Sequence, residues 1–512
     1  MREAWARLAA LAPSLPEGPP LARRQRRWLD GLLEREQHTA FGGAHGFARI
    51  KDPEAYREAV PARSYEGFSP WLSRITEGEP DQLFRGLPVA FERTGGSAGG
   101  TKLIPYSREG LADFRKALRP WLAGAIRRHG LEEGTGYWVT SPALRAVQEI
   151  LPGVPLGLSD AVYLGEDAIE DLARVSALPP WVAELGEVGP WRLATLHALV
   201  VHEDLAFISL WSPTFLTDLL DHLLEEDPVL DCLLGEGGTL AGQGLGAESA
   251  AFHRLQQFRQ TGSTGVLWPR LRMLSAWADG ASEPYARELQ RRIPHAVFEA
   301  KGLLSTEGVV SVPGAGGAAV LAADSGFFEF MVEDGTPRFA WELAAGMRAE
   351  VILTTASGLY RYRTGDRIEC TGFEGDTPRL RFLGRAGLVS DLVGEKLDEA
   401  FVAECLRDVA GFRMLLPAQA PARRYLLVVD RAEVPPTQGQ LEMLETRLRA
   451  NPQYAHARQF GQLEAVAVMA AEKPLATYLA HQTAQGQRPG TLKIPALRPE
   501  PGWAMIFLQE TP

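Results

Sequence analysis

The chain has 512 residues, of which 45% are hydrophobic and 23% are charged. This length predicts about two to four domains, and the composition is that of a folded globular protein, which excludes collagen-like, coiled-coil and wholly disordered chains. Its 64 acidic residues outnumber its 53 basic residues, and a net charge of −11 gives no electrostatic basis for binding nucleic acid or an anionic membrane surface.

The N-terminal residues and the cysteines bear on the compartment. The first twenty residues carry Glu3 and only a short apolar stretch before several prolines, which differs from a secretory signal peptide. No apolar run approaches the roughly 18 residues of a membrane-spanning helix. The three cysteines, Cys232, Cys370 and Cys405, form no CxxC pair and predict neither a disulfide framework nor a thiolate metal site. These features predict a cytoplasmic protein.

Strand and helix patterns alternate after a mixed helical and polar region at residues 20–82. The apolar run Leu205 to Trp211 predicts a buried strand, and Ser212 and Pro213 follow it as the N-cap and first residue of a helix. The same strand and helix patterns recur further along the chain, at residues 270–276, 282–292 and 296–300. Such alternation favours parallel sheets covered by helices.

A glycine-rich segment follows the apolar stretch Leu87 to Phe91 and reads Thr94-Gly-Gly-Ser-Ala-Gly-Gly-Thr-Lys102. Four glycines in these nine residues let backbone N–H groups face an anion, while hydroxyl and ammonium groups can also donate hydrogen bonds. The segment therefore predicts a triphosphate-binding loop. It is not a Walker loop, because Thr101 occupies the lysine position and a strand is predicted next. The alternative is a hairpin tip with solvated hydroxyls.

Two later segments carry polar groups after predicted strands. The first, Leu303-Leu-Ser-Thr-Glu307-Gly, offers a carboxylate that can hold Mg²⁺ near phosphates, although the same residues also suit an ordinary turn. The second, Gly358-Leu-Tyr-Arg-Tyr-Arg-Thr-Gly-Asp366, follows the apolar strand Val351 to Thr355. Its aspartate can accept hydrogen bonds from ribose hydroxyls, and its tyrosines and arginines offer stacking surface and phosphate charge. The alternative is a buried Arg–Asp pair with packed tyrosines.

In this order and spacing, the three segments resemble the nucleotide motifs of the adenylate-forming enzymes, which include acyl-CoA synthetases, peptide-synthetase adenylation domains and luciferases. More narrowly, the chain is similar to the Gretchen Hagen family of acyl-acid amido synthetases, known from plant auxin and jasmonate conjugation and also found in bacteria. The chain is expected to be a bacterial member. Further matches to the family are Thr371-Gly-Phe373, Pro378, Arg381-Phe382 and Lys396-x-Asp398-Glu399. The resemblance covers residues 85–400 and continues faintly to the end.

The resemblance implies an α/β fold with two domains. Residues 1–384 would form a large N-terminal domain of helix-covered β-sheets that binds ATP and the acyl acid. Residues 385–512 would form a small, mobile α+β C-terminal domain that supplies the catalytic lysine, and the change of texture near Arg385 agrees with this division. Gly384 and Gly387 supply torsional freedom at the join.

The implied reaction is a two-step ligation. A carboxylic acid attacks the α-phosphate of ATP, pyrophosphate leaves, and an amine, commonly an amino acid, takes the acyl group. The implied ATP-binding residues are Thr94, Gly95, Gly96, Ser97, Gly99, Gly100, Thr101, Lys102, Ser305, Thr306, Glu307, Tyr362, Asp366 and Arg385. Among them, Glu307 would hold Mg²⁺, Asp366 the ribose hydroxyls, and Arg385 ribose or phosphate.

The resemblance also implies a catalytic lysine on a late loop of the small domain, beside the α-phosphate. Beyond Lys396, the chain offers only Lys473 and Lys493. Lys493 lies in a loop rich in glycine and proline, whereas Lys473 lies at a predicted helix start, so we expect Lys493 to act in catalysis together with Glu307.

The acyl pocket is expected between the glycine-rich segment and residues 110–225. Trp138, Trp211 and Phe215 are candidates to line it, because large flat side chains suit an aromatic or aliphatic acid. Their alternative role is ordinary core packing.

One departure from the family pattern leaves other activities open. The family's Ser-Ser-Gly-Thr-Ser corresponds to Arg93 through Ser97, so one hydroxyl is lost at Gly96. A ligase that passes the acyl group to coenzyme A or a carrier protein is one alternative, and a non-catalytic nucleotide-binding homologue is another. A phosphotransferase is less favoured, because its product would be ADP and not AMP.

Overall fold

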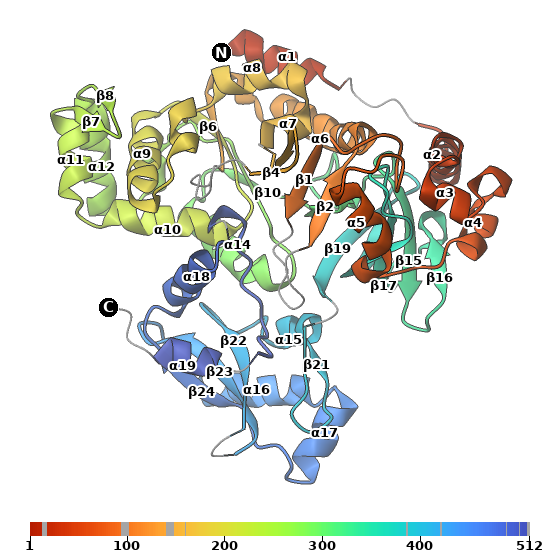
Figure 1. Cartoon of the computed structure of the whole chain (residues 1–512). Helices are drawn as coiled ribbons and strands as arrows, with labels where there is room; N and C mark the ends of the chain where they lie inside the picture. Colours follow the sequence, from red (N-terminus) through yellow and green to blue (C-terminus); the bar gives the residue numbers. More distant parts are fainter. Residues whose placement is uncertain are drawn as a thin grey trace.

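The computed structural model of the chain describes residues 1–12, 18–93, 102–139, 148–158, 160–385, 388–419, 422–487, 489–500 and 502–508. They form a larger body and a smaller body, the latter built from residues after 388 (Figure 1). Helices and sheets are mixed in both, which confirms the predicted α/β class. Within these residues no helix has the length and apolarity that a membrane crossing requires.

The first helices pack against the rest of the larger body through buried polar anchors. They are α1 (Arg2–Ala10), α2 (Leu21–Glu36), α3 (Ala40–Ala44), α4 (Pro53–Ala59) and α5 (Ser69–Thr76). Trp5 of α1 donates its Nε1 hydrogen to the carbonyl of Gly134, at 2.8 Å. Gln25 of α2 is fully buried, donates to the carbonyls of Ala323 and Gly326, and accepts from the backbone N–H of Phe328. These bonds satisfy groups that burial would otherwise leave unpaired.

A four-stranded parallel sheet confirms the predicted alternation of strands and helices. Its order is β10 (Val297–Ala300), β9 (Met273–Ala276), β6 (Leu205–Ser209) and β3 (Thr135–Trp138). The helix expected after Ser212 is α10 (Pro213–Leu224). The other helices of this region are α6 (Arg108–His129), α7 (Asp160–Leu164), α8 (Glu166–Val175), α9 (Val188–Val201), α11 (Pro228–Gly235), α12 (Ser249–Thr261), α13 (Thr264–Leu267) and α14 (Glu283–Arg292).

The two faces of this sheet pack on different helices, because successive side chains of a strand point to opposite sides. Ile208 and Leu274 share a core with α9, α10, α12 and α14. Phe207 and Met273 share another core with α1, α6 and α8. The carboxyl ends of the strands are thus framed by helices on both sides.

A seven-stranded antiparallel sheet was not predicted, since the sequence pattern favoured parallel sheets. Its order is β13 (Ser311–Pro313), β14 (Ala319–Leu321), β19 (Thr377–Arg385), β18 (Tyr362–Glu374), β17 (Arg348–Thr354), β15 (Phe327–Val332) and β16 (Pro337–Phe339). The short hairpin β11 (Leu304–Ser305) and β12 (Gly308–Val309) precedes it, and β7 (Gly238–Leu240) pairs with β8 (Gln243–Leu245) elsewhere.

The predicted phosphate loop connects two paired strands. β1 (Ala90–Arg93) and β2 (Leu103–Tyr106) are antiparallel neighbours in a sheet with β5 (Val154–Leu156) and β4 (Gln148–Leu151). The strand expected after Lys102 is therefore confirmed. Residues 94–101, which carry the predicted glycines and hydroxyls, lie outside the described residues.

The smaller body contains a three-stranded sheet, β22 (Met414–Ala418), β23 (Arg424–Asp430) and β24 (Ala467–Ala471), with the hairpin β20 (Val389–Ser390) and β21 (Leu397–Asp398). Its helices are α15 (Glu399–Cys405), α16 (Gln438–Leu448), α17 (Pro452–Gln459), α18 (Pro474–Ala484) and α19 (Trp503–Leu508). Arg385 is the last residue of β19, so that strand runs one residue past the predicted domain boundary. Gly387 at the predicted join lies outside the described residues.

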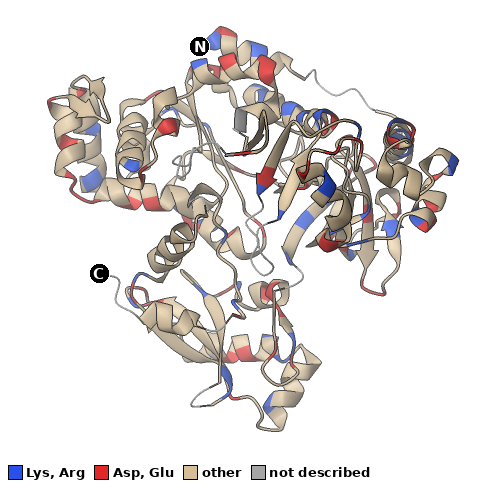
Figure 2. Ribbon diagram, viewed as in Figure 1, with Lys and Arg blue, Asp and Glu red and all other residues tan. Residues whose placement is uncertain are grey.

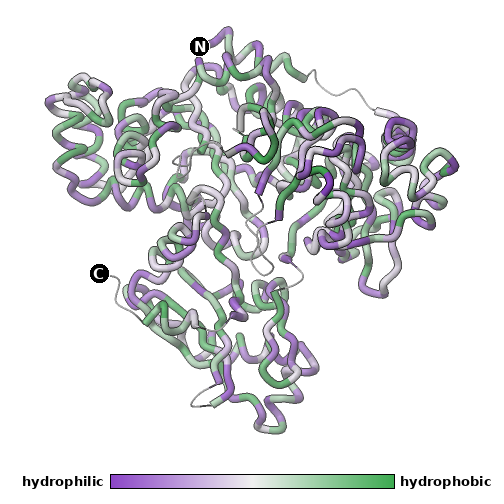
Figure 3. The backbone as a smooth tube through the Cα atoms, in the orientation of Figure 1, coloured by the Kyte–Doolittle hydropathy of each residue, from purple (hydrophilic) through white to green (hydrophobic). Residues whose placement is uncertain are grey.

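Charge and hydropathy are distributed as in an ordinary globular chain. Basic and acidic residues are interspersed along the ribbon of both bodies (Figure 2). Many helices alternate between hydrophilic and hydrophobic segments along their turns, as amphipathic surface helices do (Figure 3).

A buried ion pair ties the start of β18 to the N-terminal helices. Arg361 is 4% exposed and lies 2.7 Å, Nε to Oε2, from Glu329 on β15. Its Nη1 also donates to the carbonyls of Arg57 and Val60. Arg361 therefore stabilises the fold and is not available to bind phosphate. The sequence suggested a buried Arg–Asp pair as the alternative, and the partner is instead Glu329.

Arg361→Met is expected to destabilise the protein strongly, because it removes one of the two arginines that pair with the buried Glu329. Breaking a buried pair costs about 3 to 5 kcal/mol, and we expect a loss near the lower end of that range, since Arg57 still pairs with Glu329. Arg363→Met is the matched control, since Arg363 pairs with Glu350 at the surface and an exposed pair contributes about 1 kcal/mol or less. Thermal unfolding of both variants followed by circular dichroism checks this. Equal losses would contradict the structural role.

Candidate active site

Two acidic residues that are far apart in sequence meet at one guanidinium group. Arg385 Nη2 lies 3.8 Å from Glu307 Oε1, and Arg385 Nε lies 3.5 Å from Asp366 Oδ1. Both carboxylates are buried, while the arginine is about one-third exposed. Two of the three predicted nucleotide segments thus face a common centre.

The local structure explains why these groups converge. Asp366 and Arg385 are register partners on β18 and β19, so their side chains leave the sheet side by side. Glu307 lies in the turn between β11 and β12, and this turn packs tightly on β17, because a Cβ atom at Gly308 would lie 2.9 Å from Leu353 Cδ2. A larger residue there would require Leu353 to shift.

Lys102 and Tyr362 extend the same centre toward the glycine-rich segment. Lys102 Nζ donates to Tyr362 Oη at 3.2 Å, and Tyr362 Oη donates to Glu307 Oε1 at 3.2 Å. Lys102 is the residue directly after the eight residues that the structure does not describe. The end of the predicted phosphate loop is therefore connected to the predicted metal ligand through one tyrosine.

Ser305 and Thr306 are occupied by the turn itself in this structure. Ser305 Oγ donates to the carbonyl of Gly308 at 3.3 Å, and the carbonyl of Thr306 accepts from Tyr106 Oη at 2.5 Å. These bonds fix the turn that carries Glu307. The predicted contact of both residues with ATP stays a prediction.

Lys493 approaches the centre from the smaller body. Its Nζ lies 4.5 Å from the ring centroid of Trp277 and 5.9 Å from that of Phe382. The loop that carries Lys493 is fixed to α15, because the backbone N–H of Ala496 donates to Glu399 Oε1 at 3.1 Å. Lys473, the other late lysine, is exposed as the N-cap residue of α18.

The charges perturb one another in this centre. Burial raises the pKa of Asp366, while Arg385 and Lys493 act in the opposite direction. The negative charge of Asp366 raises the pKa of Arg385. Lys493 is exposed, but protein atoms crowd around it, and this desolvation lowers the pKa of its ammonium group. The negative charge of Asp366 opposes this change. Perturbed groups gathered in one place are typical of functional sites.

The three predicted acyl-pocket aromatics do not share one environment. Trp211 lies 5.8 Å, centroid to centroid, from Trp277 and so lies close to Lys493. Trp138 packs on Trp5 and Phe207, in the core beneath α1 and α6.

Phe215 packs on Trp191 in the core on the opposite face of the parallel sheet. Trp211 is thus the predicted acyl residue that lies nearest to the charged centre. Its neighbour Trp277 was missed, although it directly follows a strand that was predicted.

The donor set is compatible with a magnesium ion that completes its shell on phosphate. Mg²⁺ commonly takes one or two carboxylates, several waters and substrate phosphates. Glu307 supplies one such carboxylate beside Arg385. Across the described ranges, no three acidic, histidine or cysteine residues group as a metal site, so a resident ion held by protein alone is not indicated there.

The histidines of α9 have structural environments. His197 is buried, and burial lowers the pKa of its imidazole, while His202 Nδ1 contacts Asp204 Oδ1 at 3.2 Å.

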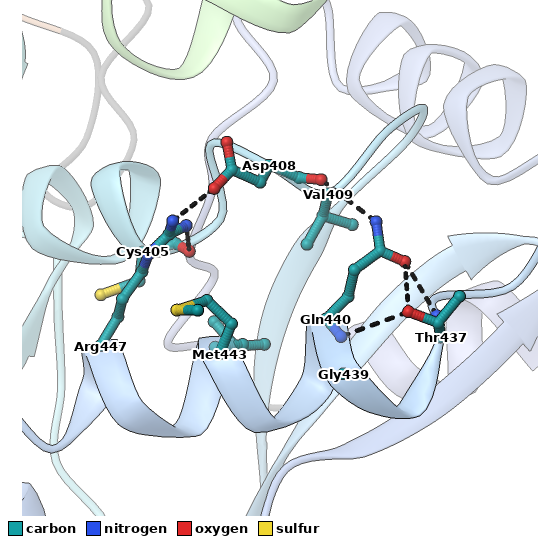
Figure 4. Close-up of a pocket in the computed structure, with 9 residues that line it drawn as sticks. Cys405, Asp408, Val409, Thr437, Gly439, Gln440, Met443 and Arg447 are labelled. Atoms are coloured by element: carbon teal, nitrogen blue, oxygen red, sulfur yellow. Dashed lines mark hydrogen bonds and ion pairs between the residues drawn. The ribbon is translucent and has the colours of Figure 1, made fainter.

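A small cavity lies away from this centre, between α15 and α16 (Figure 4). It measures about 290 Å³, and an Arg447–Asp408 ion pair and the side chains of Gln440 and Met443 line it. No predicted site residue contributes to it.

The fold is that of the adenylate-forming ligases. The structure superposes on the acyl acid amido synthetase AtGH3.15 in complex with 2,4-DB with a TM-score of 0.83 and 17% identity, covering 99% of this chain and 96% of that one. It also superposes on a 2-hydroxyisobutyryl-CoA ligase in its postadenylation state, with a TM-score of 0.50 and 13% identity over 94% and 92% of the two chains.

The chain belongs to the GH3 family, the Gretchen Hagen family of the sequence comparison above. Residues 21–229 match the GH3 family N-terminal domain and residues 319–385 match the GH3 family central domain, which together are more than half of the chain. A probable indole-3-acetic acid-amido synthetase of Oryza sativa subsp. japonica is 25% identical over 80% of this chain and 73% of its own length. A jasmonoyl–L-amino acid synthetase of Nicotiana attenuata is 22% identical over 73% and 71%.

The segment that carries Trp277 also contains a titrating carboxyl group. Asp279 Oδ2 accepts from the backbone N–H of Phe382 on β19, at 3.3 Å. Burial raises the pKa of Asp279 to about 6. The native state therefore binds this proton more tightly than the unfolded chain does. As a result, ionisation of Asp279 lowers the free energy of unfolding, which is highest at low pH and falls as pH rises toward 6.

Asp279→Asn is expected to be increasingly more stable than the parent as pH rises from about 4 to about 7, by about 2 kcal/mol in total. The amide oxygen of asparagine can still accept from Phe382, so the gain reflects the removed charge. Urea titrations across this pH range measure it. Asp324→Asn, at an exposed ion pair with Arg24, is the control and should show no such trend. A constant difference for Asp279→Asn would contradict the assignment.

Proposed function

We propose that the chain is an ATP-dependent acyl-acid amido synthetase, which activates a carboxylic acid as an acyl-adenylate and transfers the acyl group to an amine, most simply an amino acid. The observation that carries this proposal is the convergence of Glu307, Asp366 and Arg385 beside Lys493. Family membership supports the reaction class, because the named relatives above are amido synthetases.

Each group in the centre has a task that its chemistry suits. Asp366 accepts hydrogen bonds from the ribose hydroxyls, since a carboxylate is an acceptor with two oxygens. Arg385 binds ribose or phosphate, and its positive charge stabilises the two buried carboxylates, Glu307 and Asp366. Lys102, together with the hydroxyls and backbone N–H groups of Thr94 through Thr101, binds the β- and γ-phosphates.

Glu307 would hold Mg²⁺ against the phosphates, and this ion would neutralise charge that develops on the departing pyrophosphate. Tyr362 orients Glu307 through its hydroxyl group. Ser305 and Thr306 complete the wall of this site beside the phosphates.

Lys493 stabilises the transition state of adenylation. Attack by the acid builds negative charge at the α-phosphate, and a fixed ammonium group there is worth more in the transition state than in the ground state. The proposal divides the chain into an ATP- and acid-binding domain, residues 1–384, and a lysine-bearing domain, residues 385–512. Rotation at the join would release Lys493 before the amine attacks, and a cytoplasmic location is compatible with the use of ATP.

A screen for pyrophosphate release tests the proposal. Aryl, indolyl and aliphatic acids are incubated with ATP and Mg²⁺, with and without mixed amino acids, and products are identified by mass spectrometry. Acid-dependent pyrophosphate and an amide product are expected. A thioester formed only with coenzyme A would favour the acyl-CoA ligase alternative, and ATP binding without any acid-dependent pyrophosphate would favour a non-catalytic homologue.

Lys493→Ala is expected to lower acid-dependent ATP–pyrophosphate exchange by about 10² to 10³, because loss of one preorganised charge contact costs roughly 2.7 to 4 kcal/mol of transition-state stabilisation. ATP binding, measured by calorimetry, should change little. Lys473→Ala is the matched control at an exposed position of the same body. Near-parental exchange in Lys493→Ala, or an equal loss in both variants, would remove Lys493 from the mechanism.

A further inference from the structure

Lys301 is a buried lysine that the proposed reaction does not use. It directly follows β10 at the carboxyl end of the parallel sheet and is 5% exposed. Its Nζ donates to Ser209 Oγ at 2.7 Å and lies 5.0 Å from the ring centroids of both Trp121 and Trp211. In open α/β sheets, ligands bind at the carboxyl ends of the strands.

The sheet face beneath Lys301 is unusually polar for a buried surface. Ser209, Ser275 and Glu299 form one row across β6, β9 and β10, and all three are buried. The carboxylate of Glu299 is bound by α6, through Trp121 Nε1 at 2.8 Å and Arg128 Nη2 at 2.9 Å. Buried polar groups are normally paired.

Ser275 Oγ is an exception, since it has no hydrogen-bond partner among the residues that the structure describes. Two hydroxyl groups and an ammonium group therefore lie together at the carboxyl end of the sheet, beside the indole rings of Trp121 and Trp211. Such a combination suits a ligand that is apolar along its length and polar at its tip.

Two neighbouring indole rings lie between Lys301 and Lys493. Lys493 lies 4.5 Å from Trp277, the rings of Trp277 and Trp211 are 5.8 Å apart, and Trp211 lies 5.0 Å from Lys301. Trp121, Trp211 and Trp277 are all partly exposed, so a ligand can reach their faces. A carboxylate activated beside Lys493 would thus leave the far end of the same molecule near Lys301.

We propose that Lys301, with Ser209, is a specificity-determining residue that binds an oxygen-bearing substituent at the end of the acyl acid distant from the activated carboxylate. An ammonium group only donates hydrogen bonds, so the substituent must accept them, as a hydroxyl or a second carboxylate does. The indole faces of Trp211 and Trp277 suit an aromatic ring between the two ends. This inference deepens the proposed function and rests on it for the position of the activated carboxylate.

The test compares phenylpropanoic acid with its para-hydroxy and para-carboxy derivatives. The parent protein is expected to prefer the substituted acids in kcat/KM for ATP–pyrophosphate exchange. Lys301→Met, which keeps the length of the side chain, should lower that preference by about tenfold to a hundredfold through the KM of the substituted acids, since hydrogen bonds to a charged group are the stronger ones. Exchange with unsubstituted phenylpropanoic acid should be unchanged.

Ser209→Ala is the second variant and should lower the same preference by a smaller factor; it decides the question by itself if Lys301→Met does not fold. Lys116→Met, at an exposed lysine of α6 paired with Asp113, is the matched control and should leave the preference unaltered. Equal losses for all three acids in Lys301→Met and Ser209→Ala would indicate a purely structural role and overturn the inference.

Calorimetric binding of the same acids to the protein separates this inference from the proposed function. If no acid supports exchange, yet the substituted acids bind more tightly and lose that advantage in Lys301→Met, the proposed reaction fails and the Lys301 site stands. If exchange occurs with no preference that depends on Lys301, the reaction stands and the inference fails. If the acids neither bind nor react, both fail.

Discussion

The structure of the candidate site depends on one constraint, the burial of Glu307 and Asp366 within reach of a single guanidinium group. A buried carboxylate without a cation is expensive, and two of them close together raise that expense further. Arg385 offsets it, and because Arg385 is the last residue of β19, the same residue that balances the charge also leads into the smaller body. Any rotation at this join would therefore change the electrostatics of the candidate site, and so would a displacement of Lys493.

Local sequence patterns predicted an element correctly where the residues that determine it lie close together in the sequence. The strand β6 and the helix α10 follow from an apolar run, a serine N-cap and a proline, and each of these signals acts within a few residues. The seven-stranded antiparallel sheet was missed, because its strand order joins β14 to β19 across more than fifty residues. For the same reason, the sequence left open whether Arg361 offers charge to phosphate or pairs with a buried carboxylate, since its partner Glu329 lies on another strand.

For the site, motif resemblance predicted Glu307, Asp366, Arg385 and Lys493. The structure brings the first three together and places Lys493 beside Phe382 of β19, and their roles stay predictions. The resemblance did not identify Trp277 or Lys301, whose significance lies in contacts with other strands and not in a local pattern. Both directly follow strands of the parallel sheet. Ligands bind at the carboxyl ends of such strands. Applying this rule to the residue directly after each predicted strand would have selected both residues.

Lysine is rare in this chain, and three of its lysines lie in or near the candidate site. The sequence has only seven lysines among its 53 basic residues, and Lys102, Lys301 and Lys493 are three of them. Arginine forms planar, two-pronged contacts, which suit the many carboxylate pairs on the surface, whereas lysine is a compact point charge on a thin stem. A compact charge fits between indole rings, where a guanidinium group would stack on them and fill the space. At Lys301 and Lys493, a lysine therefore places a positive charge beside aromatic rings with less bulk than an arginine would bring.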